Sequence, residues 1–124
     1  MKPESYLTKE GKAIFSQIAA YLEEKKQVES IDAAFVSACA NSCYLMHKYA
    51  KIIIEEGAVQ EFSTGAQNVT AAYSIFHKER DNYARMCKAL GITPEGREKL
   101  GAFAAKKQAT TSKLRSLMNK KQAK

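Results

Sequence analysis

The sequence of 124 residues lacks tryptophan and has no run of large aliphatic residues longer than the three isoleucines at 52–54. A bilayer span needs about 20 consecutive apolar residues, so the chain offers no candidate transmembrane helix. Its first residues lack the apolar stretch of a signal peptide, and three cysteines are an odd number for a secreted disulfide framework. We therefore expect a cytoplasmic protein with reduced, buried thiols.

Acidic residues are absent after Glu98. Residues 1–98 contain 12 Lys or Arg and 13 Asp or Glu, which gives a net charge of −1. Residues 99–124 contain eight Lys or Arg and no acid, which gives a net charge of +8. The positive charge of the protein therefore belongs to its C-terminal segment, a pattern typical of an arm that binds a polyanion.

Motifs for nucleotide binding and catalysis are also missing. No G-x-x-x-x-G-K-S/T loop is present, and Gly91 with Gly96 does not form a G-x-G-x-x-G fingerprint. The two histidines, His47 and His77, have no neighbouring residues that form a local Ser/His/Asp or Cys/His arrangement. We predict a protein that is not an enzyme and that uses no cofactor.

Cys39, Cys43 and His47 follow one another at intervals of four residues, which raises the question of a metal site. Eight residues of helix rise about 12 Å, whereas zinc ligands lie within about 2.3 Å of the ion. All three could not share one metal, and Cys87 or His77 would have to complete the site. Small thiols on a packed helix face are the commoner explanation. We predict no metal, and a metal-responsive regulator stays open as an alternative.

The spacing of apolar residues predicts an all-α fold. A first helix is expected over residues 8–25, with Thr8 as its N-cap. Ile14, Phe15, Ile18 and Leu22 recur at helical intervals and share one face. This segment is typical of an amphipathic helix that packs against a neighbour.

A second, longer helix is expected from about residue 30 to a left-handed stop at Gly57. Leu45 and Ile52 widen its apolar face, which indicates neighbours on two sides. Its main apolar stripe comprises Ile31, Phe35, Ala38, Cys39, Ser42, Met46, Tyr49 and Ile53, and Ser37 is placed on the opposite face.

A short extended segment or turn is expected near Val59 and Phe62, where apolar and polar residues alternate. A third helix should then run from an N-cap at Asn68 to Leu90. Because it nearly matches the second helix in length, the two should form an antiparallel hairpin. Its buried stripe is expected to comprise Ala72, Ile75, Phe76, Tyr83, Met86, Cys87 and Leu90.

Residues 90–100, Leu-Gly-Ile-Thr-Pro-Glu-Gly-Arg-Glu-Lys-Leu, read as a helix end, a sharp turn and a new helix start. Gly91 permits a left-handed stop, Thr93 caps the next helix and Pro94 occupies its first position. A weaker apolar stripe follows at Leu114, Leu117 and Met118. We predict a single domain, with a helical core and oligomerisation region over 1–92 and a basic C-terminal helix and tail over 93–124.

The pattern Leu-Gly-Ile-Thr-Pro-x-x-Arg-x-x-Leu in residues 90–100 resembles the closing motif of the P27-type phage terminase small subunits. The resemblance extends upstream to about Leu7 through the order of the helices. Two positions depart from the family pattern. Asn68 is followed by Val69 instead of proline, and Gly96 stands where Ser or Ala is common. Gly96 should weaken the first turn of its helix slightly.

The resemblance implies a DNA-packaging factor. Such small subunits assemble into rings, recognise viral DNA and deliver it to a large subunit that holds the ATPase and the nuclease. In a ring, the wide apolar faces of the two long helices could be buried in contacts between subunits. A phage-derived protein of this kind would work in the cytoplasm of the bacterial host.

Together, charge and resemblance predict that the basic extension contacts the phosphates of double-stranded DNA without reading its sequence. The expected contacts are Lys99, Lys106, Lys107, Lys113, Arg115, Lys120 and Lys121. Two alternatives stay open: a helical assembly adaptor whose lysines only keep it soluble, and a helix that lies on a membrane surface. The role of Arg97 is not assigned.

Overall fold

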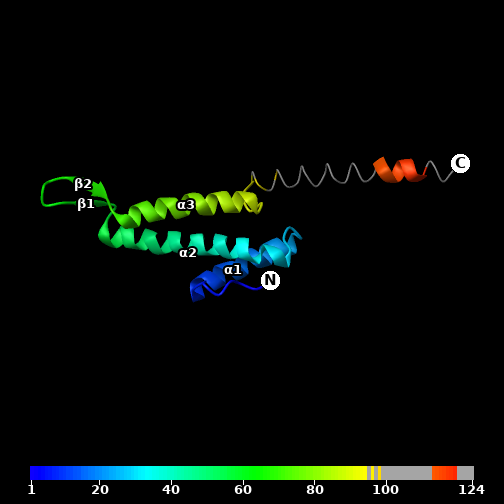
Figure 1. The fold of residues 1–124 in the computed structure, drawn as a ribbon, viewed down its shortest axis with the longest axis horizontal. Coiled ribbons are helices and arrows are strands. Elements are labelled where there is room, and N and C mark those ends of the chain that lie inside the picture. Colours follow the sequence, from blue (N-terminus) through cyan, green and yellow to red (C-terminus); the bar gives the residue numbers. More distant parts are fainter. Residues whose placement is uncertain (95, 97, 99–112, 120–124) are drawn as a thin grey trace. The chain divides into compact units, whose positions relative to one another are not determined.

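The computed structural model describes residues 1–94, 96, 98 and 113–119. The chain divides into two compact units, Met1–Met86 and Cys87–Lys124. The elements in chain order are α1 (Lys9–Glu24), a 3-10 turn η1 (Ser30–Asp32), α2 (Ala33–Glu56), β1 (Val59–Glu61), β2 (Gln67–Val69) and α3 (Ala71–Ala89). A further helical segment covers residues 113–119. The predicted all-α class is confirmed, with one small ribbon added between two long helices (Figure 1).

Helix α1 begins where the sequence predicts. The Thr8 hydroxyl accepts a hydrogen bond of 3.0 Å from the backbone N–H of Gly11, which satisfies one of the exposed donors of the first turn. Phe15 and Leu22 are fully buried, and Ile18 is buried beside them. They pack against the first half of α2, where Val36, Cys39, Ala40 and Cys43 complete the core.

The predicted buried face of α2 is wrong at its N-terminal end. Ile31 is 83% exposed and Phe35 is 41% exposed, whereas Ser37, predicted to face solvent, is fully buried. The reason is the segment before α1, which crosses the Ser37 side of α2. The Glu4 backbone N–H donates a 3.1 Å hydrogen bond to the Ser37 hydroxyl, and Leu7 is buried next along the chain. A polar side chain is buried here because the crossing backbone supplies its partner.

The same N-terminal segment carries a perturbed tyrosine. Partial burial and then the nearby Glu4 carboxylate raise the pKa of the Tyr6 hydroxyl. The Met1 ammonium lies 3.3 Å from the Glu23 carboxylate near the end of α1. This ion pair joins the N-terminal segment to α1, and the Glu4–Ser37 hydrogen bond joins it to α2.

An antiparallel ribbon joins α2 to α3. Val59 pairs with Val69, and Glu61 pairs with Gln67. The predicted extended segment at Val59 is therefore confirmed, but the strand β2 occupies the place where the third helix was expected to begin.

The predicted N-cap at Asn68 is wrong, because Asn68 lies within β2. The cap is Thr70, whose hydroxyl accepts from the Tyr73 N–H at 3.3 Å and donates to the Gly57 carbonyl at 3.2 Å. Gly57 ends α2 with φ 87° and ψ 164°, a glycine-favoured conformation that is extended in ψ and is not the left-handed helical stop expected. These bonds tie the end of α2 to the start of α3, and α3 then returns along α2 (Figure 1).

We expect Leu22→Ala to lower the free energy of unfolding by about 2–5 kcal/mol, because it leaves a cavity between α1 and α2. The measurement is urea denaturation followed by far-ultraviolet circular dichroism. Gln17→Ala, on the exposed side of the same helix, should change the free energy by less than about 0.5 kcal/mol. Equal effects of the two substitutions would contradict the packing of α1 described here.

Candidate nucleic-acid interface

The turn that leads into the basic extension begins with a well-formed end of α3. Gly91 has φ 74°, the left-handed conformation predicted for it. The Ile92 N–H donates to the Cys87 carbonyl at 2.9 Å, and the Gly91 N–H donates to the Lys88 carbonyl at 3.2 Å. This pair of hydrogen bonds is the Schellman motif, which satisfies the last carbonyls of a helix.

The next helix starts immediately after this turn. The Thr93 hydroxyl accepts a 3.1 Å hydrogen bond from the Gly96 N–H, which confirms Thr93 as the N-cap. Pro94 occupies the first helical position, where its missing N–H costs no hydrogen bond. Glu95 and Arg97 lie outside the described residues.

Gly96 is buried in this turn because the backbone of α3 lies directly over it. A Cβ added at Gly96 would overlap the Lys88 carbonyl oxygen and would come within 3.1 Å of the Gly91 Cα. The absence of a side chain therefore permits the two segments to approach closely. Helix propensity alone suggested that Gly96 weakens this junction, whereas the tertiary contact makes glycine the residue that fits.

Two of the seven predicted DNA contacts are described. Lys113 and Arg115 lie in the helix of residues 113–119, where every side chain is exposed. Among the described residues, neither cation has an acidic partner within ion-pair distance. The other five predicted contacts, Lys99, Lys106, Lys107, Lys120 and Lys121, lie outside the described residues.

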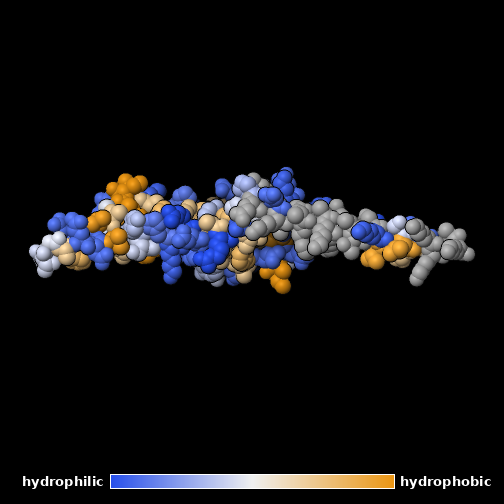
Figure 2. Space-filling view, turned by 90° about the horizontal axis from the view of Figure 1, so that it is seen from above, coloured by the Kyte–Doolittle hydropathy of each residue, from blue (hydrophilic) through white to orange (hydrophobic). Residues whose placement is uncertain are grey.

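The helix of residues 113–119 also carries an apolar stripe. Leu114, Leu117 and Met118 are 57%, 60% and 62% exposed. Figure 2 shows their hydrophobic surface on one side of this helix, beside the hydrophilic surface of the same segment. Phosphate contact would engage the two cations and leave this stripe uncovered.

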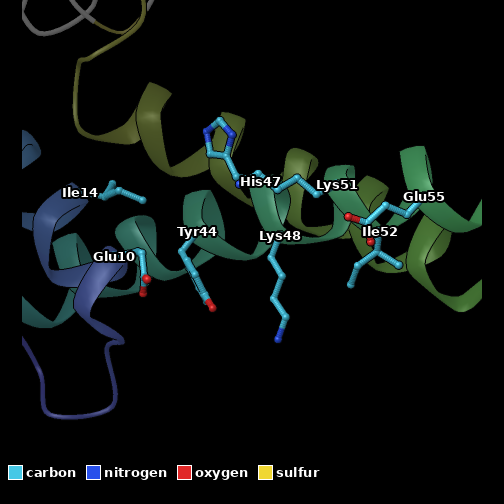
Figure 3. Close-up of a pocket in the computed structure, with 8 residues that line it drawn as sticks. All are labelled: Glu10, Ile14, Tyr44, His47, Lys48, Lys51, Ile52 and Glu55. Carbon is cyan, nitrogen blue, oxygen red and sulfur yellow. The ribbon is translucent and has the colours of Figure 1, made fainter.

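An open groove of about 640 Å³ lies between α1 and the C-terminal half of α2. Figure 3 shows Tyr44, Lys48 and Ile52 projecting from one side of α2, at successive intervals of four residues. The groove lining is completed by Glu10, Ile14, His47, Lys51 and Glu55. Because two carboxylates offset the two lysines, the groove provides no concentrated positive field for a phosphate. The charge arrangement favours the C-terminal segment as the nucleic-acid interface.

The cysteines do not form a metal centre among the described residues, where no group of three or more His, Cys, Asp or Glu is arranged to hold an ion. Cys39, Cys43 and Cys87 are all buried, and none is in a disulfide. Within the described part of the chain, no helix is both long and apolar enough to cross a membrane.

A model of the family described as "Phage terminase, small subunit" matches residues 11–107. The matched segment includes all but the first two residues of α1, and then α2, the ribbon, α3 and the capped turn that follows. The chain belongs to the phage terminase small-subunit family. No curated protein and no solved structure matched it significantly.

Membership assigns this terminase small subunit a role in phage DNA packaging, in a family whose members are generally the non-catalytic subunit. The resemblance drawn from residues 90–100 is confirmed at the level of the family. Family membership also implies DNA and the terminase large subunit as partners in general.

Gly96→Ala tests the close approach in the turn. Helix propensity alone predicts a gain of about 0.5–1 kcal/mol in stability. We expect instead a loss of about 1–3 kcal/mol, because the added methyl group overlaps the Lys88 carbonyl. Urea denaturation gives the sign, and faster hydrogen exchange at the Ile92 amide would place the effect in this turn. A stabilised Gly96→Ala variant would contradict the close approach.

Proposed function

We propose that this small subunit binds double-stranded viral DNA through its basic extension, as an oligomeric ring that delivers the DNA to the large subunit and regulates its ATPase and nuclease. The segregation of charge carries the proposal. A body with a net charge of −1 precedes a segment with a net charge of +8 and no acid. Such a segment releases counterions from the DNA backbone on binding, and its affinity needs no contacts to bases.

The described part of the extension supports this reading. Lys113 and Arg115 are exposed and have no acidic partner among the described residues, so their charges are available to a polyanion. The DNA contacts that we propose are Lys99, Lys106, Lys107, Lys113, Arg115, Lys120 and Lys121.

The proposed ring draws support from the apolar surface that the described residues leave uncovered. Ile31 and Ile54, near opposite ends of α2, are 83% and 84% exposed. Ile31 is followed along the chain by the exposed Phe35, and Ile54 by the exposed Val59 and Phe62. Exposed apolar residues grouped near both ends of a long helix suit contacts with neighbouring subunits.

The DNA interface is tested by two variants with the same loss of charge. The salt slope is the decrease in log K of duplex binding per unit increase in log salt concentration, and each phosphate contact contributes about 0.9 to it. We therefore expect the slope to fall by about 3 to 4 in a variant with four lysines changed to Gln: Lys106, Lys107, Lys120 and Lys121. The matched control changes the exposed residues Lys2, Lys9, Lys12 and Lys26 to Gln. Fluorescence anisotropy with a labelled duplex at several salt concentrations measures both.

The control variant should keep the wild-type salt slope. Equal slopes for all three proteins would show that the extension does not contact DNA, as the adaptor alternative predicts. Equal reductions in both variants would mean that only net charge matters, without a localised interface.

Native mass spectrometry of the full chain tests the ring. We expect one dominant closed assembly of several copies, because a ring with head-to-tail contacts ends at a fixed number of subunits. A monomer at micromolar concentration would contradict the ring, and a broad ladder of sizes would indicate open polymerisation instead.

A further inference from the structure

The end of the helical hairpin carries exposed apolar side chains that nothing in the described structure covers. Ile54 is 84% exposed, and Val59, Phe62 and Val69 are 57%, 47% and 45% exposed. Val59 and Val69 are direct cross-strand partners, so their side chains lie together on the ribbon. Figure 2 shows hydrophobic surface at this end of the molecule, over the end of α2 and the ribbon. We call these four residues, with Glu55, Glu56 and Glu61, the hairpin-end surface.

This surface is acidic. Residues 52–77 contain Glu55, Glu56 and Glu61 and neither Lys nor Arg, and the cation nearest to them along the chain is Lys51, which lines the groove together with Glu55. All three carboxylates are exposed, and within the described residues none lies within ion-pair distance of a cation.

Two of these carboxylates stand in an unfavourable place for the helix itself. Glu55 and Glu56 occupy the last turn of α2, which has no basic residue. The carbonyls of that turn already form the negative end of the helix dipole. A cationic partner would be attracted both by the negative end of the helix dipole and by the two adjacent carboxylates. A complementary binding partner is therefore one with apolar and basic side chains.

The helix of residues 113–119 has this complementary character. Its apolar stripe consists of Leu114, Leu117 and Met118, which are all more than half exposed. Lys113 and Arg115 lie on either side of the stripe, each roughly 100° from its centre at 3.6 residues per turn. An apolar stripe between two cations complements a segment that carries both exposed apolar side chains and exposed carboxylates.

We propose that the hairpin-end surface of one copy binds the helix of residues 113–119 of a second copy. Every copy offers one such helix and one such surface, and both are exposed in the single chain. Repetition of this contact from head to tail covers both surfaces on every subunit and leaves none uncovered when a ring closes. The inference rests on the self-association proposed above, and it names the two surfaces that make the contact.

This pairing also divides the basic extension between two tasks. In the assembly Lys113 and Arg115 face the carboxylates of the neighbouring copy, so this pairing withdraws them from the DNA contacts proposed above. The remaining proposed contacts, Lys99, Lys106, Lys107, Lys120 and Lys121, stay available for DNA. Assembly and DNA binding then respond differently to substitutions in the same segment, which makes the inference testable.

The first test compares two full-length variants that add one negative charge to the helix. Leu117→Asp places it in the apolar stripe, and Ser116→Asp places it on the opposite side. We expect Leu117→Asp to weaken self-association at least about tenfold in sedimentation velocity, as for loss of a central interface contact. Ser116→Asp should change it by less than about threefold. Both should lower the salt slope of duplex binding per subunit equally, because both lose one unit of positive charge.

The second test changes the acceptor. Glu55→Lys with Glu56→Lys should weaken self-association at least about tenfold. The matched control, Glu10→Lys with Glu24→Lys, alters two exposed carboxylates of α1 and should leave it unchanged. Circular dichroism verifies that each variant is folded. Combining Lys113→Glu and Arg115→Glu with the acceptor change should restore association, which a merely unfolded variant could not do.

Mixing the two defective proteins shows whether the helix binds the hairpin-end surface of a second copy or that of its own chain. The Leu117→Asp variant keeps its hairpin-end surface, and the Glu55→Lys, Glu56→Lys variant keeps its helix. We expect each alone to be monomeric and an equimolar mixture to form a dimer of one copy of each in native mass spectrometry. A mixture that stays monomeric would overturn the inference, since the helix would then bind its own chain or nothing.

Other results separate this inference from the proposed function. If the wild type assembles and binds DNA but Leu117→Asp and Ser116→Asp behave alike, only the named contact is wrong. If the wild type is monomeric, the ring and this contact fail together. If Leu117→Asp abolishes binding to vesicles of anionic phospholipid and leaves assembly intact, the helix is a membrane-surface element and the inference is overturned.

Discussion

The packing of α1 against the first half of α2 is the contact on which the rest of the structure depends. Phe15, Leu22 and Val36 are essentially inaccessible to solvent there, and no comparable cluster forms along the rest of α2 in the described residues. Helix α1 has 16 residues and α2 has 24, or about 24 Å against about 36 Å of rise. The shorter helix leaves the far end of α2 uncovered, and α2 then carries the ribbon and the return of α3 from that end (Figure 1).

The end of α2 with the ribbon and the C-terminal extension carry charge of opposite sign. Residues 52–77 are acidic and apolar, whereas residues 99–124 are basic without a single acid. A DNA duplex would be repelled by the first segment and attracted by the second. The proposed function assigns the acidic, apolar end to protein contacts and the basic segment to DNA. The groove along α2 has both lysines and carboxylates in its lining, so it is less suited to binding either a basic protein surface or DNA.

The turn from Cys87 to Gly96 joins the helical body to the basic extension. The Schellman bonds after α3, the Thr93 cap and the glycine at position 96 each remove freedom from the junction. These backbone contacts define where α3 ends and where the next helix begins.

The sequence by itself determined the elements whose signals are local. Thr8 and Thr93 cap their helices, Gly91 ends α3, and the excess of positive charge follows Glu98, all of which depend on neighbours along the chain. The family was also recognisable from residues 90–100, since its motif lies in that turn. Only the tertiary structure decided the burial of Ser37, the exposure of Ile31 and the need for glycine at position 96. Ser37 is buried because residues 4–7 cross α2 on its side, and position 96 needs glycine because the Lys88 carbonyl lies against it across the turn. Helical periodicity carries no information about either contact.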